Sequence, residues 1–126
     1  MNLRFRVHEM ELAIARLDPD ASVPDWATGD GFVSVTRTAD ELSIVCDASR
    51  VPADVRHERG WAILELEGPF PFELTGILVS FIAPLADAKI GIFAMSTFDT
   101  DIVLVKRASL DAALAALDRA GHLRID

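Results

Sequence analysis

The order of hydrophobic patterns over residues 61–126 constrains the fold of this chain more than any other feature. In residues 61–67, WAILELE, Leu64 and Leu66 alternate with Glu65 and Glu67, as in a strand with one solvent-facing side. A stripe at helical spacing follows, made of Leu74, Ile77, Leu78, Phe81, Ile82 and Leu85. Two strand patterns, a second helical pattern and a short last strand complete the chain. This βαββαβ order predicts an α+β fold of the ferredoxin-like type.

The boundaries of the two expected helices carry their own signals. Ser109 is placed to cap the start of the second helix, and Gly121 to end it. His122 then follows where a side chain can interact with the negative end of the helix dipole. Pro84 has no N–H for the carbonyl four residues earlier, so we expect the first helix to kink or end between Ser80 and Pro84.

The first half of the chain is mostly strand in pattern and holds no convincing helix. Residues 3–8 alternate apolar and charged side chains, whereas residues 11–17 fit a strand or a short helix equally well. Residues 32–37 and 41–47 read as a hairpin, and the polar segment 48–60 as a linker. We therefore predict an abbreviated, mostly β unit over residues 1–57 and a complete βαββαβ domain over residues 58–126.

The central strands of the second half are apolar at both odd and even positions. IGIFAM, residues 90–95, and IVLV, residues 102–105, offer apolar side chains to both faces of a sheet. Helices of a ferredoxin-like fold cover one face only, so we expect the other to be covered as well. The first half of the chain or a second copy would supply that cover, which favours a homo-oligomer, most simply a dimer.

Charge and composition narrow the range of partners and locations. The net charge is −8 and no cluster of Lys or Arg occurs, which argues against nucleic acid or an anionic membrane as partner. The single cysteine, Cys46, cannot form an intramolecular disulfide. The N-terminus is charged where a signal peptide needs an apolar run, and no apolar stretch reaches transmembrane length. We expect a cytoplasmic protein.

The segment FELTGILVSFIAPLADAKIGIFAMSTFDTDIVLV, residues 72–105, resembles the ACT domain. It combines a glycine at the start of the first helix, LADAKIGI leading into a strand, and a hairpin. With ELSIVC at 41–46, GW at 60–61 and GH at 121–122, it is most similar to the ACT subfamily that includes the CASTOR arginine sensors and their small bacterial relatives. The resemblance implies two tandem ACT-like units, the first abbreviated, that bind small molecules, often amino acids, between units.

The sequence also departs from that family at positions near the expected pocket. Phe98 and Ile102 stand where the resemblance leads us to expect tyrosines, so a hydroxyl often present there is absent. Thr75-Gly76 replaces the Pro-Gly pair of metabolic ACT domains. The identity of the ligand therefore does not transfer from the family.

Two segments are candidates for a ligand site. At the helix start, Gly76 would let a ligand approach the backbone, where free N–H groups attract a carboxylate; alternatively, this glycine serves only the turn or helix packing. In the hairpin, Ser96 and Thr97 can bond a zwitterion and Asp99 or Asp101 can take its ammonium group, unless these side chains only hold the turn. The full candidate set is Glu73, Thr75, Gly76, Ile77, Leu78, Met95, Ser96, Thr97, Phe98, Asp99 and Asp101.

Three functions remain open on these residues, and the first is the leading one. It is a non-enzymatic, amino-acid-binding regulatory module acting on a separate protein partner. The second is a small hydrolase or transferase that uses Asp99 and Asp101 as an acid/base pair. The third is a ligand-free structural dimer, in which Phe70, Phe72 or Phe98 would fill the space beside Gly76.

No metal or cofactor is expected at either candidate segment. The DTD sequence at residues 99–101 offers too few oxygen ligands for a hard cation. The three histidines, His8, His57 and His122, lack the spacing of a zinc site.

Overall fold

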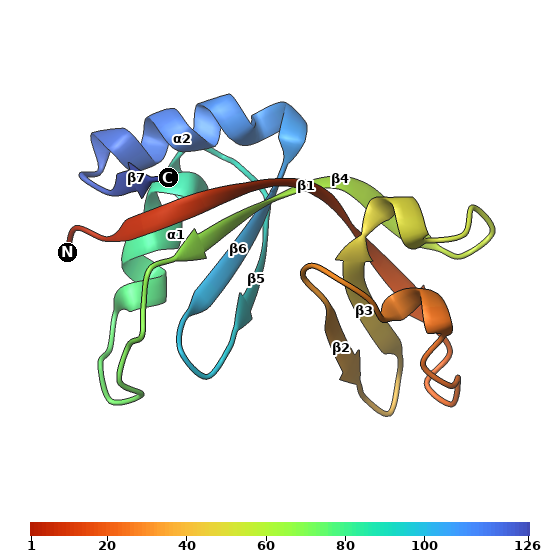
Figure 1. Ribbon diagram of the computed structural model, residues 1–126. Coiled ribbons are helices and arrows are strands. Elements are labelled where there is room, and N and C mark those ends of the chain that lie inside the picture. The colour runs from red at the N-terminus through yellow and green to blue at the C-terminus, as the bar shows by residue number, and fades with distance from the viewer. The chain divides into compact units, whose positions relative to one another are not determined.

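The computed structural model describes residues 1–126 as seven strands and two α-helices (Figure 1). The strands are β1 (Arg4–Leu17), β2 (Ser34–Arg37), β3 (Leu42–Asp47), β4 (His57–Leu66), β5 (Ile92–Ser96), β6 (Asp101–Lys106) and β7 (Leu123–Ile125). The helices are α1 (Ile77–Asp87) and α2 (Leu110–Arg119), and short 3₁₀ turns cover Asp25–Ala27, Ala48–Arg50 and Arg107–Ser109. No helix of the chain is long and apolar enough to cross a membrane.

The chain forms two compact units. The larger unit comprises Met1–Glu9 and Ala62–Asp126, and the smaller unit comprises Met10–Trp61. Both β1 and β4 run from one unit into the other, so neither unit is a continuous half of the sequence. The strand order is β2-β3-β1-β4-β6-β5, with β7 paired to β1.

The larger unit confirms the predicted βαββαβ order as β4-α1-β5-β6-α2-β7. One strand of its sheet, however, comes from the start of the chain. Residues 4–6 of β1 pair in parallel with Leu123–Ile125 of β7, while the N–H of Glu67 donates to the carbonyl of Arg4 at 2.8 Å. The first strand therefore lies between β7 and β4.

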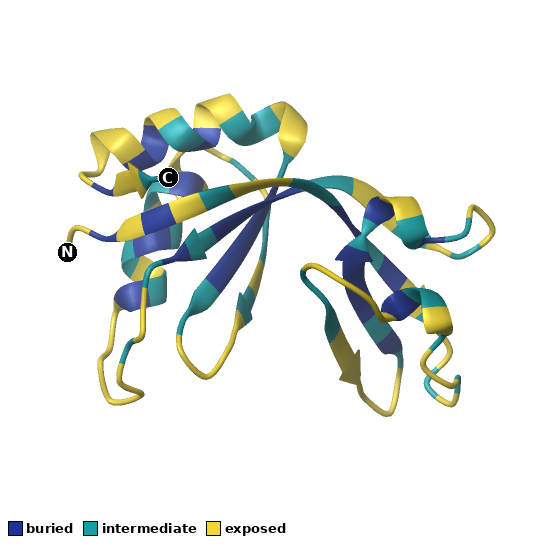
Figure 2. Cartoon of the chain, in the orientation of Figure 1, coloured by how far each residue is buried: buried dark blue, intermediate teal, exposed yellow.

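The core of the larger unit lies between its sheet and the two helices (Figure 2). The strands contribute Leu3, Phe5, Leu64, Leu66, Val103 and Val105, and the helices contribute Ile77, Phe81, Leu85, Ala113 and Leu117. Phe5 and Phe81 meet edge to face with ring centroids 5.3 Å apart, a geometry favoured by aromatic quadrupoles. Burial of each such ring contributes about 1.5–3 kcal/mol to folding.

Strand β6 is buried on both faces, as its doubly apolar pattern predicts. Val103 and Val105 belong to the helix-covered core. Ile102 and Leu104 alternate with them and point to the opposite face, yet they are only 5% and 0% exposed. Burial on both sides of β6 therefore explains why its odd- and even-numbered residues are all apolar.

Of the two outcomes predicted for the first helix between Ser80 and Pro84, a kink or an end, the end is wrong, because α1 continues through Pro84 to Asp87. Pro84 cannot donate to the carbonyl of Ser80, but the Nε2 of His122 lies 2.9 Å from that oxygen. The N–H of Leu3 donates to the Nδ1 of the same ring at 3.0 Å, so Nε2 carries the proton. His122 is 4% exposed, and its ring replaces the donor that Pro84 lacks. Its backbone N–H donates to the carbonyl of Leu117 near the end of α2 at 3.0 Å.

The smaller unit resolves the ambiguity of residues 11–17 in favour of a strand. These residues continue β1 without interruption and pair antiparallel with β3, from Leu12 opposite Asp47 to Leu17 opposite Leu42. The β2–β3 hairpin is confirmed. Cys46 lies in a buried cluster of small and aliphatic side chains, and this burial raises the pKa of its thiol. A buried, protonated thiol is a packing element rather than a nucleophile.

Loops of the smaller unit are held by arginine side chains that donate to backbone carbonyls. Arg50 donates to the carbonyl of Asp30 at 2.6 Å, Arg37 to that of Ala21 at 2.8 Å, and Arg16 to that of Asp40 at 2.8 Å. No α-helix is present in this unit. Side-chain bonds therefore organise loop backbone that a helix would have satisfied internally.

Candidate functional site

A cleft of about 270 Å³ opens in the larger unit where the loop before α1 meets the β5–β6 hairpin. Its lining comprises Phe70, Pro71, Phe72, Leu74, Gly76, Ile77, Leu78, Ser96, Thr97, Phe98, Thr100 and Asp101. This volume is just below the roughly 300–1,000 Å³ of pockets for drug-sized ligands. The cleft suits a small metabolite.

The start of α1 forms one side of the cleft and has no side-chain cap. Gly76 occupies the N-cap position with φ 83° and ψ 0°, a left-handed conformation that glycine adopts without strain. The first intrahelical bond runs from the N–H of Ser80 to the carbonyl of Gly76 at 2.9 Å. The amides of the first turn have no partner within the helix and carry its partial positive charge. Gly76, Ile77 and Leu78 therefore bring an electropositive backbone edge into the lining.

The position that a side chain at Gly76 would occupy is open. A Cβ built at Gly76 would meet nothing within 4 Å. The ligand-free structural alternative required Phe70, Phe72 or Phe98 to fill that space. None of these rings lies within 4 Å of the position of that Cβ.

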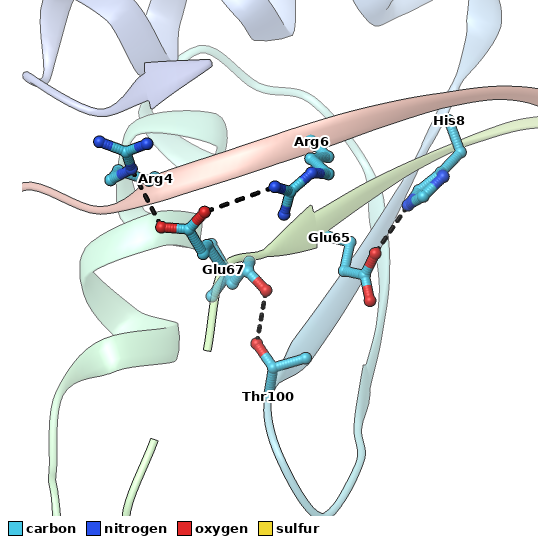
Figure 3. A network of polar contacts seen from close by, with 7 residues as sticks. Arg4, Arg6, His8, Glu65, Glu67 and Thr100 are labelled. Atoms are coloured by element: carbon cyan, nitrogen blue, oxygen red, sulfur yellow. Dashed lines mark hydrogen bonds and ion pairs between the residues drawn. The ribbon is translucent and has the colours of Figure 1, made fainter. Parts of the chain in front are cut away.

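The β5–β6 turn is held by its two threonines. The N–H of Thr97 donates to the carbonyl of Thr100 at 2.8 Å, and the N–H of Thr100 donates back to the Thr97 hydroxyl at 3.3 Å. The hydroxyl of Thr100 also donates to the carbonyl of Leu66 at 2.8 Å, which ties the hairpin to the end of β4 (Figure 3). The turn is thus organised without either aspartate side chain.

The two aspartates of the hairpin have different positions. Asp101 lines the cleft and lies opposite Ser96 in the β5–β6 register, where the Ser96 hydroxyl donates to its Oδ1 at 2.5 Å. Asp99 is exposed outside the lining, and its backbone carbonyl accepts the N–H of Phe70 at 2.8 Å. The acid/base pair considered from the sequence is therefore not assembled in the cleft, because only one of its members lies there.

Gly68 is a sterically restricted position that the sequence pattern did not single out. A Cβ on Gly68 would lie 2.6 Å from the backbone carbonyl of Asp99, closer than any side chain tolerates. Only glycine lets the loop before α1 approach the hairpin this closely. This contact shapes the cleft, and the glycine and prolines of GPFPF at residues 68–72 were its only sign in the sequence.

An aromatic pair stands at the rim of the cleft. Phe72, from the loop, and Phe98, from the hairpin, meet edge to face with centroids 4.9 Å apart. Both rings line the cleft, yet they are 73% and 79% exposed. Two large apolar rings in contact, but largely in water, form an apolar surface that a ligand can cover.

The sequence-predicted residues divide into two groups in the structure. Gly76, Ile77, Leu78, Ser96, Thr97, Phe98 and Asp101 line the cleft, whereas Glu73, Thr75, Met95 and Asp99 do not. Sequence reasoning did not include Phe70, Pro71, Phe72, Leu74 and Thr100, which also line it. Asp101 is the single charged side chain of the lining, and nowhere in the chain do three His, Cys, Asp or Glu residues gather as a metal site requires.

A charged network lies on β1 and β4 of the larger unit, on the face away from the helices (Figure 3). Glu67 pairs with the Nε of Arg4 at 3.0 Å and with Arg6 at 3.5 Å, and Glu65 lies 2.7 Å from the Nε2 of His8. These side chains alternate with core residues of the same strands and are partly solvated. Ion pairs of this kind contribute about 0–1 kcal/mol each, so we assign them a structural role.

Comparison with known proteins identifies relatives of this chain. The family profile of the ACT domain matches residues 56–119, and a second profile, for an N-terminal domain, matches residues 11–54. The human protein CASTOR3P is 33% identical over 92 residues, which cover 63% of this chain and 56% of the human protein. The alignment thus spans little more than half of the human relative.

Solved structures share the fold. A protein of Agrobacterium tumefaciens has a TM-score of 0.94 and 45% identity, covering 99% of this chain and 93% of its own. The regulatory subunit of aspartate kinase from Thermus flavus has a TM-score of 0.62 at 11% identity, covering 92% of this chain and 95% of its own. The second likeness is one of fold alone.

Proposed function

The chain belongs to the ACT domain family, and we propose that it is a regulatory module whose cleft binds a free amino acid without catalysing a reaction. The observation that carries this proposal is that one small cleft offers two groups of opposite charge as binding partners for a ligand. The uncapped start of α1 lies on one side, and the carboxylate of Asp101 lies on the other. A zwitterion is the smallest ligand that satisfies both.

The ligand carboxylate binds the first-turn amides at Gly76–Leu78, where the helix dipole favours a negative group. The ligand ammonium donates to Asp101, whose Oδ1 already accepts from Ser96 and whose Oδ2 is left to accept the new bond. Hydrogen bonds between charged partners are about twice as strong as neutral ones. The hydroxyl of Ser96 fixes the carboxylate orientation that this contact needs.

Regulation follows if the ligand binds one arrangement of the protein better than another. The bound amino acid would join the loop before α1 to the β5–β6 hairpin, which are now linked by the bond from Phe70 to Asp99 and by packing at Gly68. The signal would pass to a second copy of the chain or to a separate protein partner. If the signal passes to a second copy, light scattering with and without ligand should show a change in the mass of the oligomer.

The test is a binding screen of the twenty amino acids by thermal shift, followed by calorimetry of those that stabilise the protein. A ligand at 100 times its dissociation constant should add about 2.7 kcal/mol to the free energy of unfolding. Asp101→Asn should weaken binding at least about tenfold, because the ligand ammonium loses a charged acceptor. Asp99→Asn is the matched control and should bind like the wild type, since Asp99 lies outside the cleft.

Two results would contradict the proposal. One is the lack of stabilisation by any of the twenty amino acids. The other is equal weakening of binding by the two asparagine variants, which would mean that Asp101 acts only through the overall negative charge of the hairpin.

A further inference from the structure

We propose that Phe72 and Phe98 make this cleft selective for amino acids with an apolar side chain, branched aliphatic or aromatic, over those with a charged one. This inference rests on the proposed function and names the ligand class of the same site. It follows from the aromatic rim, from the charges of the lining and from the remaining apolar wall.

The rim places apolar surface where the ligand side chain must lie. With the carboxylate at Gly76 and the ammonium at Asp101, the ligand backbone is held in the cleft that Phe72 and Phe98 border. The two rings are 73% and 79% exposed and already in edge-to-face contact at 4.9 Å. An apolar side chain laid against them removes aromatic surface from water, which stabilises the complex by about 25 cal/mol for each Å² covered.

The lining provides no partner for a second charge. Asp101 is its one charged side chain, and both of its oxygens are used, by Ser96 and by the ligand ammonium. A guanidinium or a second ammonium would need another carboxylate, and Glu73 lies outside the lining. A ligand carboxylate side chain would need a cation, and no Lys, Arg or His lines the cleft. A charged side chain would therefore lose hydration without a compensating bond.

The inner wall continues the apolar surface of the rim. Phe70 packs against the hydrophobic core, and Leu74, Ile77 and Leu78 line the cleft beside the start of α1. At about 270 Å³ the cleft has room for one amino-acid side chain of moderate size.

The experiment is calorimetry of the full chain with glycine, leucine, phenylalanine, arginine, lysine and aspartate. Leucine or phenylalanine should bind at least about tenfold tighter than arginine, lysine or aspartate, a factor that the burial of one apolar side chain supplies. Phe98→Ala should weaken leucine or phenylalanine binding about tenfold and change glycine binding less than about twofold, because glycine has no side chain to contact the ring. Phe72→Ala should act in the same direction.

Val79→Ala is the matched control. Val79 is an exposed apolar residue of α1 outside the lining, so its truncation should leave every affinity unchanged. Phe98→Leu keeps an apolar side chain at the rim and should retain most of the affinity for leucine. Circular dichroism of each variant checks that the fold is intact, which is expected because both rings are exposed.

The outcomes separate this inference from the proposed function. If none of the twenty amino acids binds in the wild-type screen, the proposed function fails and the inference with it. If amino acids bind but arginine, lysine or aspartate binds as tightly as leucine and phenylalanine, the inference is overturned and the proposed function stands. The inference is likewise overturned, and the proposed function stands, if Phe98→Ala weakens the binding of glycine and leucine equally or changes the binding of neither.

Discussion

The two compact units contain parts of the same two long strands, β1 and β4, yet they complete their structures differently. The larger unit covers its sheet with α1 and α2 and builds an aromatic and aliphatic core. The smaller unit uses loops and 3₁₀ turns, a core rich in alanine, and arginine bonds to loop carbonyls. A helix start presents unpaired amides, whereas the loop carbonyls of the smaller unit are already occupied. The candidate cleft lies in the larger unit, beside such a helix start.

The largest effect is expected from the residue that completes α1 in the larger unit. His122→Ala removes the acceptor of the buried Leu3 N–H and the donor to the partly buried Ser80 carbonyl. Two polar groups left unsatisfied should lower the free energy of unfolding by about 2–4 kcal/mol. Urea denaturation of the variant and the wild type would measure this loss of stability.

His57→Ala in the smaller unit is the matched control for that comparison. The ring of His57 makes one short-range contact, from Nδ1 to the carbonyl of Val55 at 2.6 Å, and is only half-buried. Its loss should cost less than about 1 kcal/mol. Equal losses in the two variants would show that the histidine of the larger unit is not a structural replacement for the missing helix bond.

The next effect concerns the contact that shapes the cleft. Gly68→Ala forces a methyl group to within 2.6 Å of the Asp99 carbonyl, so the loop or the hairpin must move. Stability should fall by about 1–3 kcal/mol, and amino-acid affinity should fall with it. Gly91→Ala is the control, because a Cβ there meets nothing within 4 Å and the backbone is not left-handed. If amino-acid affinity is unchanged in Gly68→Ala, the contact between Gly68 and Asp99 does not contribute to ligand binding.

The smallest effect is expected in the loops of the smaller unit. Arg50→Ala removes the bond to the Asp30 carbonyl at 2.6 Å and a longer one to the Thr28 carbonyl. Loss of partly solvated bonds should cost about 0.5–1.5 kcal/mol. Hydrogen exchange should rise in residues 28–31 without changing that of α1. Faster exchange throughout the larger unit would mean that the two units are not stabilised separately.

Residues with local signals could be singled out from the sequence, and residues that act through distant contacts could not. The glycine at the helix start and the Ser96–Asp101 segment stood out because turn chemistry and polar side chains interrupt apolar runs. Gly68 did not stand out, because the carbonyl that makes a glycine necessary there belongs to another segment, the β5–β6 hairpin. Pro84 predicted a kink or an end of the helix from backbone chemistry alone. The helix does not end there, and the buried His122 supplies a donor to the Ser80 carbonyl from beyond α2.

The sequence by itself determined the order of the elements, the faces they bury and the two segments that contribute most to the cleft lining. These properties follow from periodicities of two and 3.6 residues, which are local. The tertiary structure alone decided that residues 4–6 lie between β4 and β7, that β1 runs unbroken from Arg4 to Leu17, and that Asp101 rather than Asp99 lines the cleft. Periodicity says which face of a strand is buried; it does not say which strand or loop becomes the neighbour, because that choice depends on the packing of the whole chain.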